Sequence, residues 1–328
     1  MGIETNGIGI LSLPTFLEEI QRLPECHHVV TMSRQFDSGD KAIALYRQLG
    51  EKGPMITCVD ASAQKGFNSG FQNSLAGTET IRRTHERYSG IPVIGSFVGR
   101  NHIRLTITGE TVYFSTFDYA EASFDRDEMF LKITDPELVQ LMKIVALWDY
   151  DRKDEFRRWD VNGFSVFFDT GTSSRSGIND YLSTFIRKNV AQISEMWIVS
   201  SWYPDKIWQA IYETAENGRQ INMLINDPTE YESIGKMPFM LTKLLSRALV
   251  RSRVPAKAVI YYPEKQFHAK FILTKMRSGG SWWFVGSSNF TNFGVMARTA
   301  ELGISGKDES VAQQLKGYIQ TLPVRRIN

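Results

Sequence analysis

The chain has 328 residues, of which 42% are hydrophobic and 23% are charged, as in an ordinary globular protein of about two domains. This composition excludes a mainly disordered, collagen-like or coiled-coil chain, and no apolar run of about 18 residues predicts a transmembrane helix. The 38 Lys and Arg residues against 36 Asp and Glu residues argue against a strongly basic nucleic-acid coat protein. Cys26 and Cys58 form no disulfide framework and predict a reducing, cytoplasmic compartment.

Hydrophobic periodicity, together with Gly and Pro residues at the ends of segments, predicts alternating helices and strands along the chain. In the first half, the expected helices are 12–23, 40–50, 79–88 and 136–148. The expected strands of that half are 28–33, 55–59, 91–97, 102–108 and 111–117. This alternation indicates an α/β protein with parallel or mixed sheets that are covered by helices.

The same order of elements recurs in the second half of the chain. The expected helices are 178–193, 206–216, 237–252 and 309–322. The expected strands are 164–168, 196–200, 221–225, 258–262, 267–274 and 282–286. A charge-dense stretch, 149–160, lies between the two copies, and we expect repeats at 1–155 and 156–328. Repeats of this length indicate two packed domains or one pseudo-dimeric domain rather than a solenoid.

The most informative segment is FHAKFILT at 267–274, followed by WFVGSSNFT at 283–291. Residues two apart on a strand share a face, so His268 and Lys270 are expected to point the same way. The Gly-Ser-Ser-Asn run ends the next strand, and a hairpin turn at 278–280 would bring Asn289 near His268. A nucleophile or acid, a fixed cation and an amide then converge, as an oxyanion such as a phosphodiester requires.

This segment resembles the phospholipase D superfamily, whose pattern is His-x-Lys, a spacer, an Asp in many members, Gly-Ser-x-Asn and a later Glu. The matching residues here are His268, Lys270, Gly286, Ser287, Asn289 and Glu301. Lys275 stands where many members have the Asp, and the hairpin is longer than the common spacing. These departures are similar to those in the wing of the superfamily that includes nucleases.

A degenerate copy of the motif lies 166 residues earlier (268 − 102 = 166), where His102 and Arg104 form His-x-Arg. The sequence FSTFD at 114–118, which contains Ser115, takes the place of Gly-Ser-x-Asn, and Glu128 takes the place of Glu301. The resemblance implies two similar α/β repeats packed as a pseudo-twofold dimer, with mixed β-sheets flanked by helices. Both motifs would then form one site, and catalysis would require no partner protein.

In that superfamily one histidine attacks phosphorus to form a phosphohistidine, and the other protonates the leaving oxygen. The resemblance makes His102 the nucleophile and His268 the general acid, without a metal or cofactor. Arg104 would grip the phosphate as a bidentate ligand. Glu301 and Glu128 would either orient the histidines or satisfy buried backbone donors. The hydroxyl groups expected beside the substrate are those of Ser287 and Ser115.

Other features bear on the substrate. The stretch 236–257 has six basic residues and no acidic one, and Lys243, Arg247 and Arg251 recur at i+4 spacing on one helix face. This stripe suits a polyanion backbone, an anionic membrane surface or simply a solvated face. Trp202 would either stack on a base or belong to the core. The acidic residues at 125–128 favour a solvated loop over a divalent-metal site.

Three functions follow from these observations. The preferred one is a metal-independent phosphodiesterase acting on nucleic acid, because the sequence begins with no recognisable secretory signal and has no membrane helix. The second is a phospholipid hydrolase or phosphatidyl transferase. The third is a catalytically inactive phosphate-binding or scaffold protein of the same fold, which the degenerate first motif favours.

Overall fold

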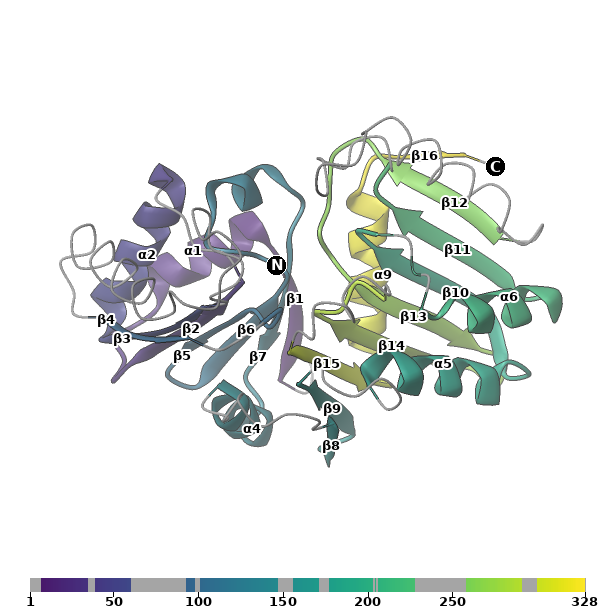
Figure 1. The fold of residues 1–328 in the computed structure, drawn as a ribbon, viewed down its shortest axis with the longest axis horizontal. Helices are drawn as coiled ribbons and strands as arrows, with labels where there is room; N and C mark the ends of the chain where they lie inside the picture. Colours follow the sequence, from purple (N-terminus) through teal and green to yellow (C-terminus); the bar gives the residue numbers. More distant parts are fainter. Residues whose placement is uncertain are drawn as a thin grey trace, which may run out of the picture.

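The computed structural model describes residues 7–34, 39–59, 93–97, 101–146, 156–170, 177–202, 204, 206–227, 258–290 and 300–327. Two mixed β-sheets flanked by helices lie side by side, one from each half of the chain (Figure 1). The α/β class and the two mixed sheets expected from the sequence are therefore confirmed.

The first sheet has seven strands in the order β1-β7-β6-β5-β2-β3-β4. Strands β2, β3 and β4 are parallel, and the remaining pairs are antiparallel. The strands are β1 (Ile8–Ser12), β2 (Val29–Ser33), β3 (Met55–Val59), β4 (Val93–Phe97), β5 (Leu105–Thr108), β6 (Thr111–Ser115) and β7 (Met129–Ile133).

The second sheet has nine strands in the order β16-β12-β11-β10-β13-β14-β15-β9-β8. The strands are β8 (Phe156–Val161), β9 (Phe164–Asp169), β10 (Ile193–Ser200), β11 (Gln220–Ile225), β12 (Ala258–Pro263), β13 (Phe271–Met276), β14 (Ser281–Gly286), β15 (Glu301–Gly306) and β16 (Val324–Arg326). Read from β9 to β12, this sheet repeats the order and the strand directions of the first sheet from β1 to β4. The internal repeat is thus structural, and β8 and β16 extend the second sheet at its edges.

The described helices follow the same repeat. They are α1 (Leu13–Arg22), α2 (Asp40–Lys52), the 3-10 helix η2 (Glu121–Asp125), α4 (Pro136–Ala146), α5 (Ile178–Asn189), α6 (Trp208–Glu216) and α9 (Glu309–Thr321). Side chains of Ser12 and Asp308 accept N-terminal N–H groups of α1 and α9, which fixes where these helices begin. By position along the chain, α1 corresponds to α5, α2 to α6 and α4 to α9.

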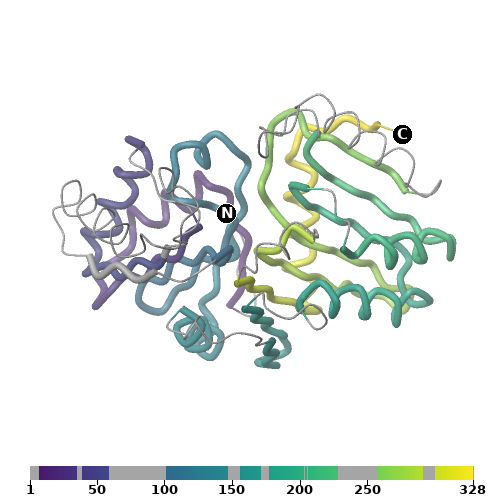
Figure 2. Tube along the Cα trace, in the orientation of Figure 1, coloured from purple at the N-terminus to yellow at the C-terminus, as the bar shows by residue number. Residues whose placement is uncertain are grey.

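Apolar side chains form three clusters that hold these layers together. The outer clusters join α1 and α2 to the first sheet and α5 and α6 to the second. The central cluster is shared by both halves and includes Leu131, Leu302 and side chains of α4 and α9. Strand β1 lies at the boundary between the halves, where Gln314 of α9 accepts the N–H of Ile10 at 2.8 Å (Figure 2). The shared core therefore fixes the two repeats against each other.

Several expected elements differ from the observed ones. The predicted strands 102–108 and 267–274 begin only at Leu105 and Phe271, because the residues before them contact the other repeat instead. The predicted helix 178–193 ends at Asn189, and Ile193 already belongs to β10. Strands β1, β7, β8, β15 and β16 were not predicted, and the expected helices 79–88 and 237–252 lie outside the described residues.

Candidate active site

The two motif histidines occupy equivalent places, each a few residues before a central strand, β5 or β13. The backbone N–H of His102 donates to the carbonyl of Ala300 at 2.9 Å, and that of His268 donates to Asp127 at 3.2 Å. Short parallel bridges extend both contacts. Each histidine is therefore seated on the segment that leads into β15 or β7 of the opposite repeat.

The carboxylates beside the histidines are exchanged between the repeats. His102 Nδ1 lies 2.8 Å from Glu301 Oε1, and His268 Nδ1 lies 3.4 Å from Glu128 Oε1. All four side chains are at least five-sixths buried, with exposed fractions of 8% and 11% in the first pair and 14% and 0% in the second. Each repeat therefore supplies the histidine of one pair and the carboxylate of the other.

A hydroxyl group holds the outer oxygen of each carboxylate. Ser287 Oγ donates to Glu301 Oε2, and Thr116 Oγ1 donates to Glu128 Oε2 at 2.7 Å. Thr116 thus takes the structural place of Ser287. The sequence comparison had chosen Ser115, whose hydroxyl accepts the N–H of Phe117 at 3.2 Å. The motif spacing could have selected the threonine, because Thr116 lies two residues before Asp118 as Ser287 lies two residues before Asn289.

The motif cations fix the backbone of the histidines. Lys270 Nζ donates to the carbonyl of His268 at 2.9 Å, and Arg104 Nη1 donates to the carbonyl of His102 at 3.0 Å. Lys270 is 1% exposed and Arg104 is 2% exposed. Burial and the nearby guanidinium of Arg104 hold the pKa of Lys270 well below its usual value.

The two motif asparagine positions are also equivalent. Asn289 Oδ1 accepts a hydrogen bond from Ser201 Oγ at 2.9 Å, just after β10. At the end of β2, Asp118 Oδ1 accepts hydrogen bonds from Ser33 Oγ at 3.1 Å and from the N–H of Arg34 at 3.0 Å. Asp118 therefore stands where the second repeat has its asparagine.

Asp118 binds Arg104 through both carboxylate oxygens. Arg104 Nε lies 2.8 Å from Oδ1, and Nη2 lies 2.9 Å from Oδ2. Burial alone would lower the pKa of Arg104, but Asp118 raises it above its ordinary value. Arg104 was expected to bind phosphate in a bidentate manner, but in the structure it makes this bidentate contact with the carboxylate of Asp118.

The electrostatics of the two His–Glu pairs differ. Burial tends to raise the pKa of Glu301, but His102 and Ser287 lower it below its ordinary value, so Glu301 is ionised at neutral pH. Burial raises the pKa of Glu128 to about 7, against the opposing effects of Thr116 and Lys270. Burial, Lys270 and Arg104 hold the pKa of His268 well below its ordinary value.

The ionised Glu301 determines which nitrogen of His102 can react. A carboxylate accepts the Nδ1–H of His102, which leaves the lone pair on Nε2. That Nε2 is buried and has no hydrogen-bond partner among the described residues. The lone pair of His102 Nε2 is therefore not used in a hydrogen bond within the described part of the chain.

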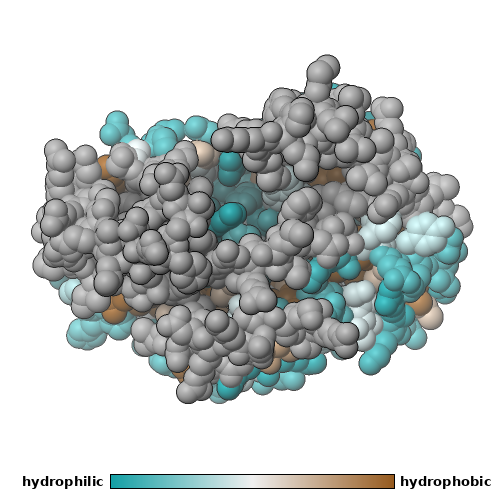
Figure 3. All heavy atoms as spheres, in the orientation of Figure 1, coloured by the Kyte–Doolittle hydropathy of each residue, from teal (hydrophilic) through white to brown (hydrophobic). Residues whose placement is uncertain are grey.

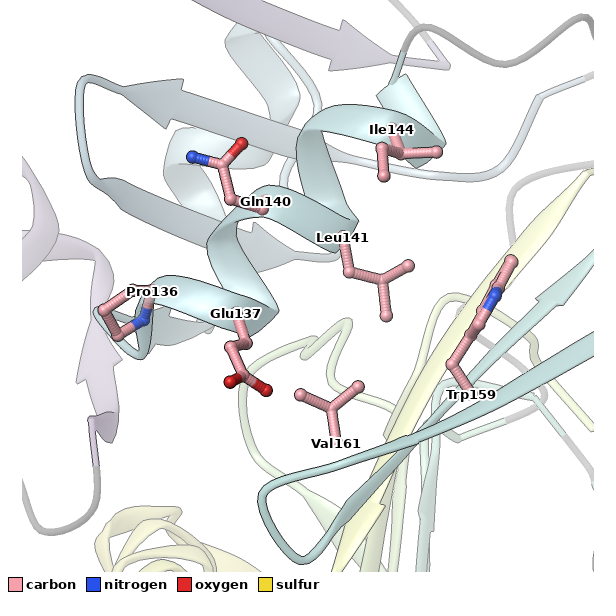
Figure 4. A pocket seen from close by; sticks show the side chains of 7 residues that line it. All are labelled: Pro136, Glu137, Gln140, Leu141, Ile144, Trp159 and Val161. Carbon is pink, nitrogen blue, oxygen red and sulfur yellow. The ribbon is translucent and has the colours of Figure 1, made fainter.

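Near the boundary of the halves, the described residues that face the viewer in Figure 3 are mainly hydrophilic. A separate, shallow groove of about 380 Å³ lies between α4 and β8 (Figure 4). The residues that line it are Pro136, Glu137, Gln140, Leu141, Ile144, Trp159 and Val161. This groove is mostly apolar and no histidine lines it, so it is separate from the site of the two His–Glu pairs.

The remaining sequence candidates fall in different places. Lys243, Arg247 and Arg251 lie outside the described residues. Trp202 follows β10 and is partly buried, two residues from Ser200, whose hydroxyl donates to the carbonyl of Asn289 at 2.9 Å.

The acidic residues at 125–128 do not gather around one point. Asp125 pairs with Lys41 at 3.1 Å and Asp127 with Lys265 at 3.3 Å, while Glu128 faces His268. In the part of the chain that the structure describes, no group of three His, Cys, Asp or Glu side chains is arranged to hold a metal ion. Within the same residues, no helix is both long and apolar enough to cross a bilayer.

Comparisons with known proteins identify the fold of the chain. Residues 188–322, which include the Lys270 and Asn289 motif, match the family described as "Cardiolipin synthase, PLD-like domain". Phosphatidylserine synthase of Haemophilus influenzae Rd KW20 superposes with a TM-score of 0.70 at 14% identity, over 100% of this chain and 88% of that chain. No protein with a curated description matches the chain by sequence.

Two further solved structures share the fold. Polyphosphate kinase from Porphyromonas gingivalis superposes with a TM-score of 0.59 at 13% identity, over 98% of this chain and 48% of that chain. Yeast tyrosyl-DNA phosphodiesterase superposes with a TM-score of 0.53 at 8% identity, over 93% and 91%. The chain therefore has the two-repeat phospholipase D-like fold, as the resemblance in its sequence implied.

Proposed function

We propose that this phospholipase D-like protein is a phosphodiesterase that works through a phosphohistidine on His102, with nucleic acid as the preferred substrate. The observation that carries the proposal is the crossed arrangement of His102 with Glu301 and His268 with Glu128. Covalent phosphoryl transfer requires two such imidazoles, and here one is hydrogen-bonded to a carboxylate of the other repeat while the second faces one at 3.4 Å.

In the first step, the lone pair on His102 Nε2 attacks phosphorus and forms the N–P bond. The bond from phosphorus to the leaving oxygen breaks, and that oxygen takes a proton from His268. Glu301 supports this attack because its carboxylate accepts the Nδ1–H of His102 and stabilises the positive charge that develops on the ring.

In the second step, His268 removes a proton from a water molecule as the water oxygen attacks phosphorus. The N–P bond then breaks, and its electron pair returns to His102 Nε2. The proton needed by His268 in the first step is supplied by its pair with Glu128, whose pKa of about 7 places one exchangeable proton there near neutrality. Lys270 and the Asn289 amide would bind the non-bridging oxygens, so the reaction needs no metal ion.

The preference for nucleic acid rests on the hydrophilic residues near the boundary of the halves and on the fold shared with tyrosyl-DNA phosphodiesterase. A phospholipid substrate is the second candidate, favoured by the match of residues 188–322 to a cardiolipin synthase domain and by the fold shared with phosphatidylserine synthase. Cys26 and Cys58 are both free thiols, which fits the reducing cytoplasm expected from the sequence.

The test is cleavage of labelled single-stranded and double-stranded oligonucleotides, and of phospholipid vesicles, in excess EDTA. Wild type is compared with His102→Ala and His268→Ala, and with His28→Ala as a matched control at an exposed histidine. We expect cleavage in EDTA that both site variants lose and the control retains. Cleavage of lipid alone would replace the preferred substrate by the second. Absence of cleavage and of acid-labile phosphohistidine on either substrate would reject the enzyme and favour an inactive binding protein.

A further inference from the structure

We infer that Asp118 is a positioning residue that keeps Arg104 engaged within the protein, so that the half-site of Lys270 and Asn289 alone holds the phosphate. The inference rests on the proposed phosphodiester chemistry, but it concerns how the anion is bound rather than whether it reacts. It predicts an effect of Asp118 on anion affinity that can be measured without turnover.

The first argument is the equivalence of the two half-sites. Arg104 and Lys270 each donate to the carbonyl of the motif histidine two residues earlier. Asp118 and Asn289 each accept a hydroxyl hydrogen bond from a serine just at or after the end of β2 or β10. The first repeat therefore has Arg–Asp in the places where the second repeat has Lys–Asn.

The second argument is that the two replacements compensate each other. Asp118 alone would repel a phosphate, and Arg104 alone would add a buried positive charge. Together they form a bidentate pair at 2.8 and 2.9 Å whose net charge is zero. Either member without the other would leave an unpaired buried charge, which is strongly destabilising.

The third argument is the set of hydrogen-bond donors that remain. Nε and Nη2 of Arg104 donate to Asp118, and Nη1 donates to the carbonyl of His102, so three of the five guanidinium N–H groups are engaged within the protein. A carboxylate has no N–H, whereas the Asn289 side chain has an amide donor. The Lys270 side thus combines a cation with an amide donor, whereas on the Arg104 side the remaining N–H groups lie beside the carboxylate of Asp118, which repels phosphate.

The direct experiment measures binding of inorganic phosphate and inorganic tungstate by calorimetry. In Asp118→Asn, the guanidinium loses its counter-charge, and we expect phosphate affinity to rise about tenfold because one nearby negative charge is removed. In the same variant we expect slower formation of the phosphohistidine from a p-nitrophenyl diester, because His102 is held less firmly. A merely structural role for Asp118 would lower both quantities.

Two further variants keep the test decisive. Arg104→Lys combined with Asp118→Asn recreates the Lys–Asn pair and should also bind phosphate more tightly than wild type, even if the single variant folds poorly. Asn289→Asp is the matched change in the other half, and it should weaken phosphate binding about tenfold, because it places a negative charge beside the proposed phosphate subsite.

The inference is overturned if Asp118→Asn and the double variant bind phosphate no more tightly than wild type, or if Asn289→Asp leaves the affinity unchanged. If no phosphohistidine or cleavage is found in wild type but the affinities change as expected, the proposed function fails and the inference stands. The two failures are therefore distinguishable.

Discussion

The two halves of the site share one framework but differ in charge. In each half, a histidine rests on the opposite repeat, a buried cation holds its carbonyl, and a hydroxyl binds the partner carboxylate. His102 is tightly paired with an ionised Glu301 at 2.8 Å, whereas His268 lies 3.4 Å from Glu128, whose pKa is raised to about 7 by burial. A symmetric fold has thus produced two unlike histidines, one suited to attack and one suited to exchange a proton.

The difference between the histidines gives the largest expected effect. His102→Ala should abolish phosphohistidine formation on every substrate, because the proposed attacking nitrogen is then lost. His268→Ala should slow cleavage of alkyl diesters about 10³-fold, yet retain the first step with a p-nitrophenolate leaving group, which needs no proton. Rapid-quench measurement of p-nitrophenol release would show a burst only in the second variant. A burst in His102→Ala instead would reverse the two roles.

Substitution of the carboxylates should also affect the first pair more than the second. Both effects should be smaller than those of the histidine variants. Glu301→Gln removes an ionised partner and should lower kcat about 100-fold, whereas Glu128→Gln replaces a partly protonated group and should cost about tenfold. Steady-state kinetics on one diester substrate would compare them. Equal losses in the two variants would show that the charge difference between the pairs has no role in catalysis.

The charge difference also predicts how stability changes with pH. Burial raises the pKa of Glu128 from 4.5 to about 7, so the unfolded chain releases this proton at lower pH than the folded protein does. The contribution of Glu128 to stability is therefore fully present below pH 4.5 and is lost as pH rises to about 7. Thermal unfolding should show this loss in wild type and in the exposed control Glu18→Gln, and much less of it in Glu128→Gln.

The smallest expected effect comes from a tyrosine hydrogen bond that supports one histidine and has no equivalent beside the other. Tyr318 of α9 donates to the carbonyl of Asp127, which also accepts the N–H of His268, while the corresponding place on α4 holds Val145. Tyr318→Phe should cost about 1 kcal/mol of stability and lower kcat a few-fold. The control Tyr113→Phe loses a bond to Glu19 on the α1 side of the sheet, in the outer apolar cluster, and should cost similar stability and leave kcat unchanged. An unaltered kcat in Tyr318→Phe would show that this hydrogen bond has a structural role only.

Much of the fold could be predicted because amphipathic helices and buried strands have periodic sequences. Strand β15 was missed because it is rich in glycine, which is depleted in strands. The structure explains these glycines, since a Cβ at Gly303 would lie 2.4 Å from the ring of Phe284. Packing against an aromatic side chain of a neighbouring strand cannot be seen from the local sequence.

The site could be predicted where the motif is intact and less well where it has degenerated. His268, Lys270 and Asn289 were selected by spacing, and His102 and Arg104 by their distance from that motif. Thr116 could have been found by aligning residues 115–118 with 286–289, but the pairing of Arg104 with Asp118 and the position of Tyr318 depend on three-dimensional contacts. Spacing along the chain carries no information about such contacts, so these features required the structure.

Because the carboxylates are exchanged between the repeats, the His–Glu pairs form late during synthesis and are lost early during denaturation. His102 is synthesised 199 residues before Glu301, the group that orients it. A growing chain can therefore fold its first sheet and still lack the carboxylate that pairs with His102, the proposed nucleophile, until the second repeat is complete. During denaturation, any separation of the repeats would break both His–Glu pairs even while each sheet remains folded.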